Sequence, residues 1–204
     1  MSKRYNIPQP GRHRREESIK RSRFITTVAW TPDVEAVKAF ISEIKAEFPD
    51  ATHNCWAYAA GPPGDTAAVG FSDDGEPHGT AGRPMLNALL HSGIGEAAVV
   101  VTRYFGGVKL GSGGLVRAYS GATATGLETT PVREKITPAR LRMELDYSLI
   151  TQFKRALADF EAVILEETFA DAAGFYVELP EENAEGFVYF LTDLSHGKAK
   201  VEKG

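Results

Sequence analysis

Cysteine is almost absent from this sequence of 204 residues, because Cys55 is its only one. A single cysteine excludes an intrachain disulfide and a metal site built from several thiolates. Long apolar runs are missing as well: none approaches the roughly 18 residues that a membrane span needs, and the N-terminus lacks the apolar core of a signal peptide. We therefore expect a cytoplasmic protein with no membrane partner.

A large excess of charge is also missing, since 23 Lys and Arg face 27 Asp and Glu, a net charge of −4. This balance does not suggest a general nucleic-acid binder. Its distribution is uneven: residues 1–23 hold eight basic and two acidic residues, whereas the other 181 hold 15 basic and 25 acidic. We interpret residues 1–15 as a basic N-terminal arm, loose on the surface. It is either a solubilising terminus or a segment that meets phosphate.

Hydrophobic periodicity predicts a mixed α/β domain over residues 16–130. The unbroken apolar run of residues 97–102 is typical of a strand covered on both faces. The predicted elements are a strand over 22–30, a helix from 31 to Pro49, a strand over 53–60, a long loop over 71–84, a helix over 84–90, the strand over 97–102 and a helix over 114–127.

The last third of the chain has the clearest pattern. Residues 131–139 are polar with two prolines and predict a linker. Residues 140–204 then give the order β-α-β-β-α-β, the ferredoxin-like unit. The fold class predicted is therefore α+β with two domains.

Two stretches hold the candidate binding residues. Phe71–Pro84 reads FSDDGEPHGTAGRP and Val99–Tyr119 reads VVVTRYFGGVKLGSGGLVRAY, where five of the nine residues from 106 to 114 are glycine. Glycine tolerates positive φ and permits close backbone approach, and a strand, a glycine loop and a helix together present N–H groups to anions. The spacing matches neither the Walker A loop nor the dinucleotide fingerprint. A close-packing loop is thus at least as plausible as a phosphate cradle.

The charged residues of these stretches allow two interpretations. The acids at 73, 74 and 76 fit either a metal or acid–base site or a turn held by side-chain to backbone hydrogen bonds. Arg103 beside Tyr104 either stacks on a base and holds a phosphate or pairs with one of the acids. A nucleophilic pair of Cys55 with His53 is conceivable, although a small buried cysteine is the simpler interpretation. We predict no metal and no cofactor. The predicted binding surface comprises His53, Asp73, Asp74, Glu76, His78, Arg83, Arg103, Tyr104, Gly106, Gly107, Gly111, Gly113, Gly114 and Arg117.

Several of these motifs together resemble the IMPACT family, most closely its bacterial YigZ-like branch. The motifs are SRF at 22–24, HNCWAY at 53–58, FSDDGEP at 71–77, GTAGRP at 79–84 and the segment 100–119. The resemblance covers roughly residues 16–130, and the tail is similar to the second domain of that branch. It implies a first domain similar to the second domain of a small-subunit ribosomal protein and a tail similar to the last domain of elongation factor G.

The resemblance also implies a function. Eukaryotic members regulate translation by competing for an activator of the amino-acid-starvation kinase. For this chain we expect a non-enzymatic regulator of translation that binds the ribosome, RNA or a translation-associated protein weakly and in a salt-sensitive way. One alternative is an enzyme acting on a phosphorylated or nucleotide substrate, with Asp73 or Asp74 as base or metal ligand. Another is a protein–protein adaptor that uses the C-terminal sheet.

Overall fold

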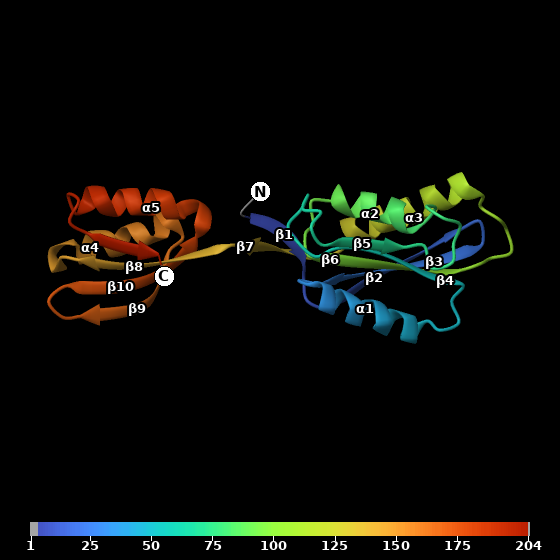
Figure 1. Cartoon of the computed structure of the whole chain (residues 1–204), viewed down its shortest axis with the longest axis horizontal. Helices are drawn as coiled ribbons and strands as arrows, with labels where there is room; N and C mark the ends of the chain where they lie inside the picture. The colour runs from blue at the N-terminus through green and yellow to red at the C-terminus, as the bar shows by residue number, and fades with distance from the viewer. Residues whose placement is uncertain (1–3, 204) are drawn as a thin grey trace. The chain divides into compact units, whose positions relative to one another are not determined.

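The computed structural model describes residues 4–203. The chain divides into two compact units, the first ending at Lys135 and the second beginning at Ile136 (Figure 1). Each unit has its own sheet and its own apolar core. The predicted two-domain α+β architecture is confirmed.

The first unit contains a five-stranded sheet in the order β2-β3-β6-β4-β5. Neighbouring strands all run antiparallel. The predicted positions of β3, β4 and β6 agree closely with the structure. By contrast, β2 begins in the segment that we interpreted as a loose arm, and the short edge strand β5 ends where we expected a loop. The strands are β2 (Arg12–Ile19), β3 (Ser22–Trp30), β4 (His53–Ala59), β5 (Val69–Ser72) and β6 (Ala97–Tyr104).

Helices cover both faces of this sheet, as Figure 1 shows. The helix α1 (Val34–Glu47) lies on one face, while α2 (Gly82–Leu90) and α3 (Ser112–Glu128) lie on the other. Side chains of β6 alternate between the two resulting cores: Val99 faces α2 and α3, and Val100 faces α1. The prediction of a strand covered on both faces is confirmed.

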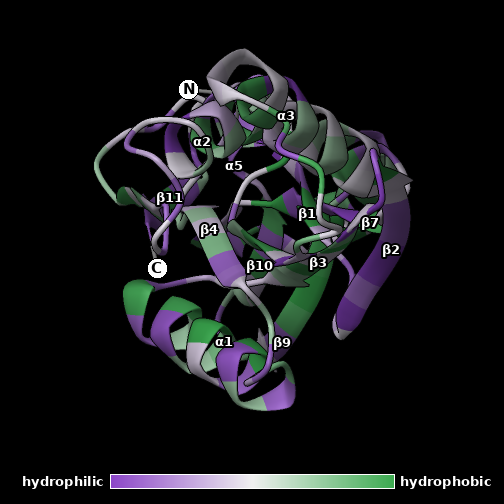
Figure 2. Ribbon diagram, turned by 90° about the vertical axis from the view of Figure 1, so that its right-hand side faces the viewer, coloured by the Kyte–Doolittle hydropathy of each residue, from purple (hydrophilic) through white to green (hydrophobic). Residues whose placement is uncertain are grey.

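The N-terminal arm is ordered in the part that the structure describes. β1 (Arg4–Pro8) pairs with β7 (Val132–Ile136), and β2 pairs along its length with β3. Ile7 is only 2% exposed, so the interpretation as a loose arm is wrong for these strands. Figure 2 shows β2 as a hydrophilic strand beside the hydrophobic β3. Because β2 lacks alternating apolar residues, its sequence did not predict a strand. Residues 1–3 lie outside the described residues.

The predicted linker is also extended, paired backbone. Residues 131–139 include β7 and the start of β8 (Pro138–Leu145). Gln9 donates its backbone N–H to the carbonyl of Pro131 at 2.9 Å, which extends the β1–β7 pairing. Pro131 stands just before β7 and Pro138 is the first residue of β8, and proline is tolerated at the start of a strand.

The carboxylate of Glu96 joins the terminal strands β1 and β7 to the strand β3. Glu96 is 4% exposed and accepts hydrogen bonds from the Tyr5 hydroxyl at 2.8 Å and the Trp30 indole at 2.9 Å. It also forms an ion pair with Lys135 on β7. Burial raises the pKa of Glu96, but the bonds from Lys135, Trp30 and Tyr5 outweigh that effect, and the pKa is lowered.

The second unit is the predicted ferredoxin-like domain. Its sheet has the order β11-β8-β10-β9, and its helices pack on one face only (Figure 1). The first helical segment consists of a 3-10 turn, a short α-helix and a second 3-10 turn, and it ends at Glu161, where φ is +53°. The other elements are η1 (Tyr147–Leu149), α4 (Ile150–Ala156), η2 (Leu157–Phe160), β9 (Val163–Phe169), β10 (Ala173–Pro180), α5 (Glu181–Leu194) and β11 (Lys200–Lys203).

Candidate functional site

The sequence-predicted binding residues meet at one end of the first sheet. His53 begins β4 and stands directly opposite Arg103 near the end of β6. The acidic loop after β5 and the glycine loop after β6 both leave from this end. The structure therefore brings the two conspicuous stretches of the sequence together.

Asp73 serves the backbone of its own loop. Its carboxylate accepts the N–H groups of Gly79 at 2.8 Å, Ala81 at 3.0 Å and Gly82 at 2.8 Å. The helix α2 begins at Gly82 without any side-chain cap from Ala81, so Asp73 supplies the anion that its N-terminus needs. Burial raises the pKa of Asp73, but the three N–H groups outweigh it and the pKa is lowered.

Asp74 joins three elements of the first unit. Its carboxylate accepts the backbone N–H of Asn54 at 2.7 Å and the Lys45 ammonium at 2.6 Å. Its carbonyl lies 2.8 Å from His53 Nδ1. Burial raises the pKa of Asp74, but the hydrogen bonds from Lys45 and Asn54 outweigh that effect, and the pKa is lowered. Both aspartates thus accept hydrogen bonds from protein donors, which agrees with the interpretation as a hydrogen-bonded turn and disfavours a general base.

Glu76 and Arg103 form a buried ion pair. The two side chains are 3% and 6% exposed and are joined at 2.5 Å between Oε1 and a terminal guanidinium nitrogen. Tyr119 donates its hydroxyl to the same carboxylate at 2.8 Å. The guanidinium lies over the rings of Phe24 at 5.5 Å and Phe105 at 5.6 Å. Of the two interpretations of Arg103, the structure therefore shows the ion pair with an acid.

Tyr104 has a different environment from Arg103. Its hydroxyl donates to Asp50 at 2.9 Å, and the guanidinium of Arg23 lies 5.5 Å from its ring centroid. Arg23 itself is bound to Glu16 at 2.6 Å. Tyr104 therefore belongs to a surface group of interacting side chains at this end of the sheet, together with Asp50, Arg23 and Glu16.

Cys55 is a buried structural thiol. It has no exposed surface, and burial is the main cause that raises its pKa to about 12. Its S–H donates to the carbonyl of Asp73 at 2.9 Å. At neutral pH the thiol is protonated, so it lacks the thiolate that a nucleophilic cysteine requires. Burial likewise raises the pKa of the neighbouring Tyr119.

The glycine loop is shaped by close packing and positive φ. A Cβ at Gly106 would lie 1.9 Å from the carbonyl oxygen of Arg21, so only glycine lets this loop rest on the β2–β3 turn. Gly107 and Gly111 have φ of +83° and +74°. Gly111 precedes α3 without a side-chain cap, and Gly113 is exposed. Because the residue before α3 is glycine, no capping side chain accepts a hydrogen bond from the first N–H groups of the helix.

Basic side chains around the glycine loop remain unpaired among residues 4–203. Sequence reasoning selected Arg83 and Arg117 but missed the others, since residues at the tip of a hairpin or inside a loop give no periodic signal. His78 is fully exposed, with Nδ1 3.9 Å from Asp73. Around this loop, the exposed basic residues without an ion pair in the described part of the chain are Lys20, Arg21, Lys109 and Arg117, and Arg83 at the start of α2 is likewise exposed and unpaired.

The acids of this site do not form a metal centre. Within residues 4–203, no three His, Cys, Asp or Glu side chains are grouped so that they hold a metal ion. This agrees with the use of Asp73, Asp74 and Glu76 as acceptors for protein donors. What the site offers chemically is a set of exposed cations and backbone N–H groups.

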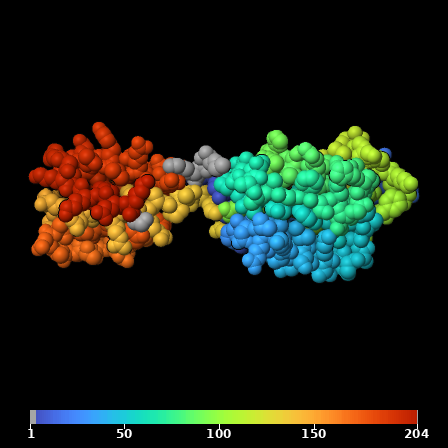
Figure 3. Space-filling model, in the orientation of Figure 1, coloured from blue at the N-terminus to red at the C-terminus, as the bar shows by residue number. Residues whose placement is uncertain are grey.

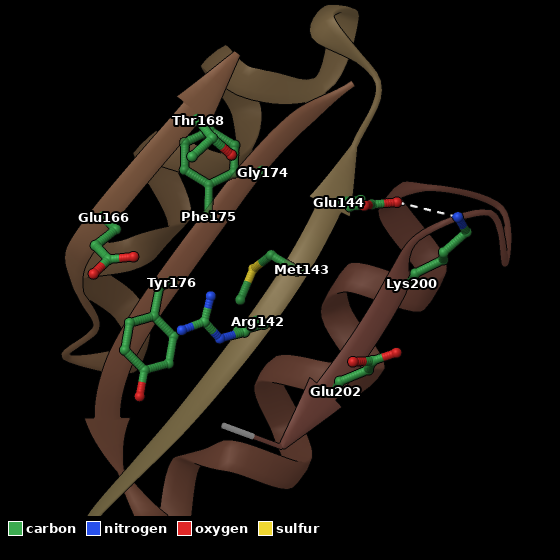
Figure 4. A pocket seen from close by; sticks show the side chains of 10 residues that line it. All are labelled: Arg142, Met143, Glu144, Glu166, Thr168, Gly174, Phe175, Tyr176, Lys200 and Glu202. Atoms are coloured by element: carbon green, nitrogen blue, oxygen red, sulfur yellow. Dashed lines mark hydrogen bonds and ion pairs between the residues drawn. The ribbon is translucent and has the colours of Figure 1, made fainter. Parts of the chain in front are cut away.

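A second concave surface lies on the open sheet face of the second unit (Figure 4). The hollow measures about 340 Å³. The Arg142 guanidinium stacks 4.4 Å from the Tyr176 ring centroid, and Lys200 pairs with Glu144 at 3.1 Å. Acids outnumber bases among its lining residues, which disfavours phosphate. The lining is Arg142, Met143, Glu144, Glu166, Thr168, Gly174, Phe175, Tyr176, Lys200 and Glu202.

Sequence comparison identifies both units. The family described as "Impact N-terminal domain" matches residues 20–127, and "Domain of unknown function (DUF1949)" matches residues 143–198. The chain belongs to the IMPACT family. The resemblance noted in the sequence is therefore confirmed, and the YigZ-like branch is supported by the relatives that follow.

Curated relatives match this IMPACT-family chain over most of its length. "IMPACT family member YigZ" of Escherichia coli (strain K12) is 42% identical over 91% of both chains. "IMPACT family member YvyE" of Bacillus subtilis (strain 168) is 33% identical over 98% of this chain and 90% of the relative. A crystal structure of a hypothetical protein is 39% identical, with a TM-score of 0.67, and the match covers 98% of this chain and 97% of that one.

Among residues 4–203 of this IMPACT-family chain, no helix combines the length and the apolar character that crossing a bilayer requires.

Proposed function

We propose that this protein is a non-enzymatic regulator of translation that binds the ribosome through RNA, using the glycine-loop face of its first unit. Membership of the IMPACT family supports a role related to translation. The face is defined by Lys20, Arg21, Phe105, Lys109 and Arg117, together with the start of α3.

The observation that carries this proposal is the sorting of charge at one end of the sheet. Glu76 and Asp73 point inward to protein donors, whereas Lys109 and Arg117 remain exposed and unpaired within residues 4–203. An overall acidic chain therefore presents local positive charge there. Phosphate contacts need such cations, and the binding they give weakens with salt.

Close packing gathers these cations. The Gly106 contact places the glycine loop against the turn that carries Lys20 and Arg21. The guanidinium of Arg117 lies 3.8 Å from the site of a Cβ on Gly113, at the start of α3. Phe105 is 47% exposed beside them and offers a ring on which a base can stack.

Arg103 has a supporting part in this proposal. Because it is buried against Glu76, it does not reach a partner; it positions the loop by packing under Phe105. Arg103→Ala is therefore a poor test of binding, since it leaves a buried carboxylate without its partner. Deleting residues 1–15 is equally unsuitable, because it removes β1 and half of β2.

The experiment is co-sedimentation of purified protein with ribosomes at low and at moderate salt. We expect the wild type to co-sediment at low salt and less at moderate salt. The double variant Lys109→Glu, Arg117→Glu reverses two exposed charges without touching the core, and we expect it to stay in the supernatant at both.

A matched control reverses two exposed charges elsewhere. Arg142→Glu with Lys200→Glu makes the same change in net charge on the second unit and is expected to co-sediment like the wild type. If both double variants bind equally well, or if the wild type does not bind at all, the proposal is wrong.

A protein adaptor that uses the second unit is favoured by one observation. The edge strand β9 exposes Val163 by 62%, Leu165 by 44% and Phe169 by 58%. Such an edge can accept a partner strand, although its bulge and glutamates hinder pairing. In the same assay, Leu165→Lys with Phe169→Lys abolishes co-sedimentation if this edge makes the contact and leaves it intact if the glycine-loop face does.

A further inference from the structure

The helix α1 covers its sheet face incompletely. A five-stranded sheet is about 24 Å wide at roughly 4.8 Å per strand, whereas one helix with its side chains is about 10 Å across. The opposite face has two helices, but α1 is the one helix of the described residues on this face (Figure 1). Figure 3 shows the residues around α1 as a blue region on the surface of the first unit. Two flanks beside α1 must therefore be covered by something else.

The flank toward β2 is sealed by arginines. Arg14 binds Glu47 on α1 at 2.8 Å and lies 5.0 Å from the centroid of Phe48. Arg12 pairs with Glu43 and Glu47. The aliphatic stems of these arginines cover the apolar edge of the core, and their charges meet acids on the helix.

The flank toward β5 is open. A groove of about 460 Å³ runs between α1 and the aromatic pair Trp56 and Tyr58, and Val34 and Ile41 line its helix side. The two rings stack at 6.0 Å, and Val34 is 37% exposed. A Cβ at Gly70 would lie 2.5 Å from the Tyr58 ring, so that ring spreads across the edge strand. Here apolar side chains lack the covering that the arginines give on the other flank.

On α1 itself, the side chains that face the open flank are opposite in charge to those that face β2. Lys38 and Lys45 line the groove, whereas Glu43 and Glu47 face β2. Lys45 is held by Asp74. Lys38 is exposed and makes no hydrogen bond or ion pair with residues 4–203. The segment that completes this flank should therefore be apolar and carry carboxylates.

We propose that the groove between α1 and the Trp56–Tyr58 pair docks an acidic, apolar peptide segment of a partner protein. Apolar side chains of that segment fill the space beside Ile41, and a carboxylate pairs with Lys38. Nucleic acid fits less well, because Lys38 is the one cation without an ion pair among the described residues that line the groove, and the two rings already stack on each other. This site is separate from the glycine-loop face and does not depend on the proposed function.

The experiment selects ligands from a displayed library of random 12-residue peptides on the full-length protein. Enriched peptides are then synthesised, and their dissociation constants are measured by fluorescence polarisation. We expect enrichment of sequences that combine Asp or Glu with large apolar residues. We expect binding to Lys38→Glu and to Val34→Glu to be about tenfold weaker, because each change sets a negative charge against the ligand's carboxylate.

Both substituted residues are exposed, so the variants keep the fold. Lys109→Glu is the matched control: it reverses a lysine of the glycine-loop face and leaves peptide affinity unchanged, while Lys38→Glu leaves ribosome co-sedimentation unchanged. The proposal is overturned if no sequence class is enriched, if basic peptides are selected, or if Lys38→Glu binds as well as the wild type. It is also overturned if light scattering shows a dimer that Lys38→Glu abolishes, which assigns the groove to a second copy.

Discussion

Among the described residues, buried carboxylates occur in the first unit and not in the second. In the first unit, Glu76 and Glu96 are almost completely buried, and each accepts bonds from two or more protein groups. In the second unit, Glu167 and Glu144 pair with lysines at the surface, with 32% and 58% of their side chains exposed. A buried carboxylate without its partner is costly, whereas an exposed ion pair contributes little because water solvates both charges.

The difference shows that an acidic motif need not be a site. The FSDDGEP stretch looks like a candidate for metal or acid–base chemistry, yet its acids fasten a loop, a helix and two strands together. In the second unit the paired acids named above lie at the surface. They contribute to its surface charge, and the fold is held by its apolar core, which is rich in aromatic residues.

The largest effect we predict is from breaking the buried pair. Glu76→Gln keeps the shape of the side chain but leaves Arg103 as an uncompensated buried charge. We expect a loss of about 3 kcal/mol in the free energy of unfolding of the first unit. Urea denaturation followed by tryptophan fluorescence measures it, because both tryptophans of the chain, Trp30 and Trp56, lie in this unit.

A double-mutant cycle separates the pair from its surroundings. Glu76→Gln combined with Arg103→Gln removes both charges, so we expect it to be less destabilised than the sum of the two single variants. Strict additivity would mean that the two groups do not interact across the observed 2.5 Å.

An intermediate effect is predicted for the loop carboxylate. Asp73→Asn removes the charge and turns one acceptor into a donor that faces an N–H group. We expect a loss of about 2 kcal/mol at pH 7, within the range for hydrogen bonds to charged groups. The same fluorescence assay measures it, with Asp65→Asn in an exposed turn as the control.

The pH dependence of this effect has a definite sign. The pKa of Asp73 is lower in the folded state than its ordinary value of 3.8, so its stabilisation is present above that value. It is lost as the pH falls through the folded pKa. The difference between wild type and Asp73→Asn should therefore be full at pH 7 and shrink below pH 3.8. A difference that grows in acid contradicts this assignment.

The smallest effect is predicted in the second unit. Glu167→Gln removes an exposed pair with Lys154 that is 2.8 Å long. We expect a change of about 0.5 kcal/mol, and less in high salt, because exposed pairs are screened. Hydrogen exchange of residues 163–180 at two salt concentrations measures it. A loss as large as that of Glu76→Gln would abolish the contrast between the two units.

The sequence predicted most of the fold because most elements carry a clean hydrophobic period. The strand Ser22–Trp30 has the predicted bounds. β1, β2 and β7 were missed because their stability comes from pairing and ion pairs, as between Arg14 and Glu47. Local pattern does not contain such contacts, since the partners are distant in the chain.

The site was predicted only in part, and for a related reason. Glycine density correctly marked a place where backbones meet, as at Gly106. The direction in which Glu76 and Arg103 point was not predictable, because it depends on Tyr119 and Phe24 from other elements. The exposed Lys20 and Lys109 could not be assigned to one surface from the sequence, because only the packing of the glycine loop on the β2–β3 turn brings their segments together.

The contacts of Glu96 with Tyr5, Trp30 and Lys135 also affect how the first unit bears mechanical load. A pull on the chain at Ile136 acts on β7, which is paired with β1 and joined to Glu96 through Lys135. Tyr5 ties β1 to that same carboxylate. Force that enters the first unit at β7 is thus shared by the β1–β7 pair, the Glu96 carboxylate, the Asn6–Ile94 bridge and the contact of Arg133 with the Trp30 ring before it reaches the five-stranded sheet.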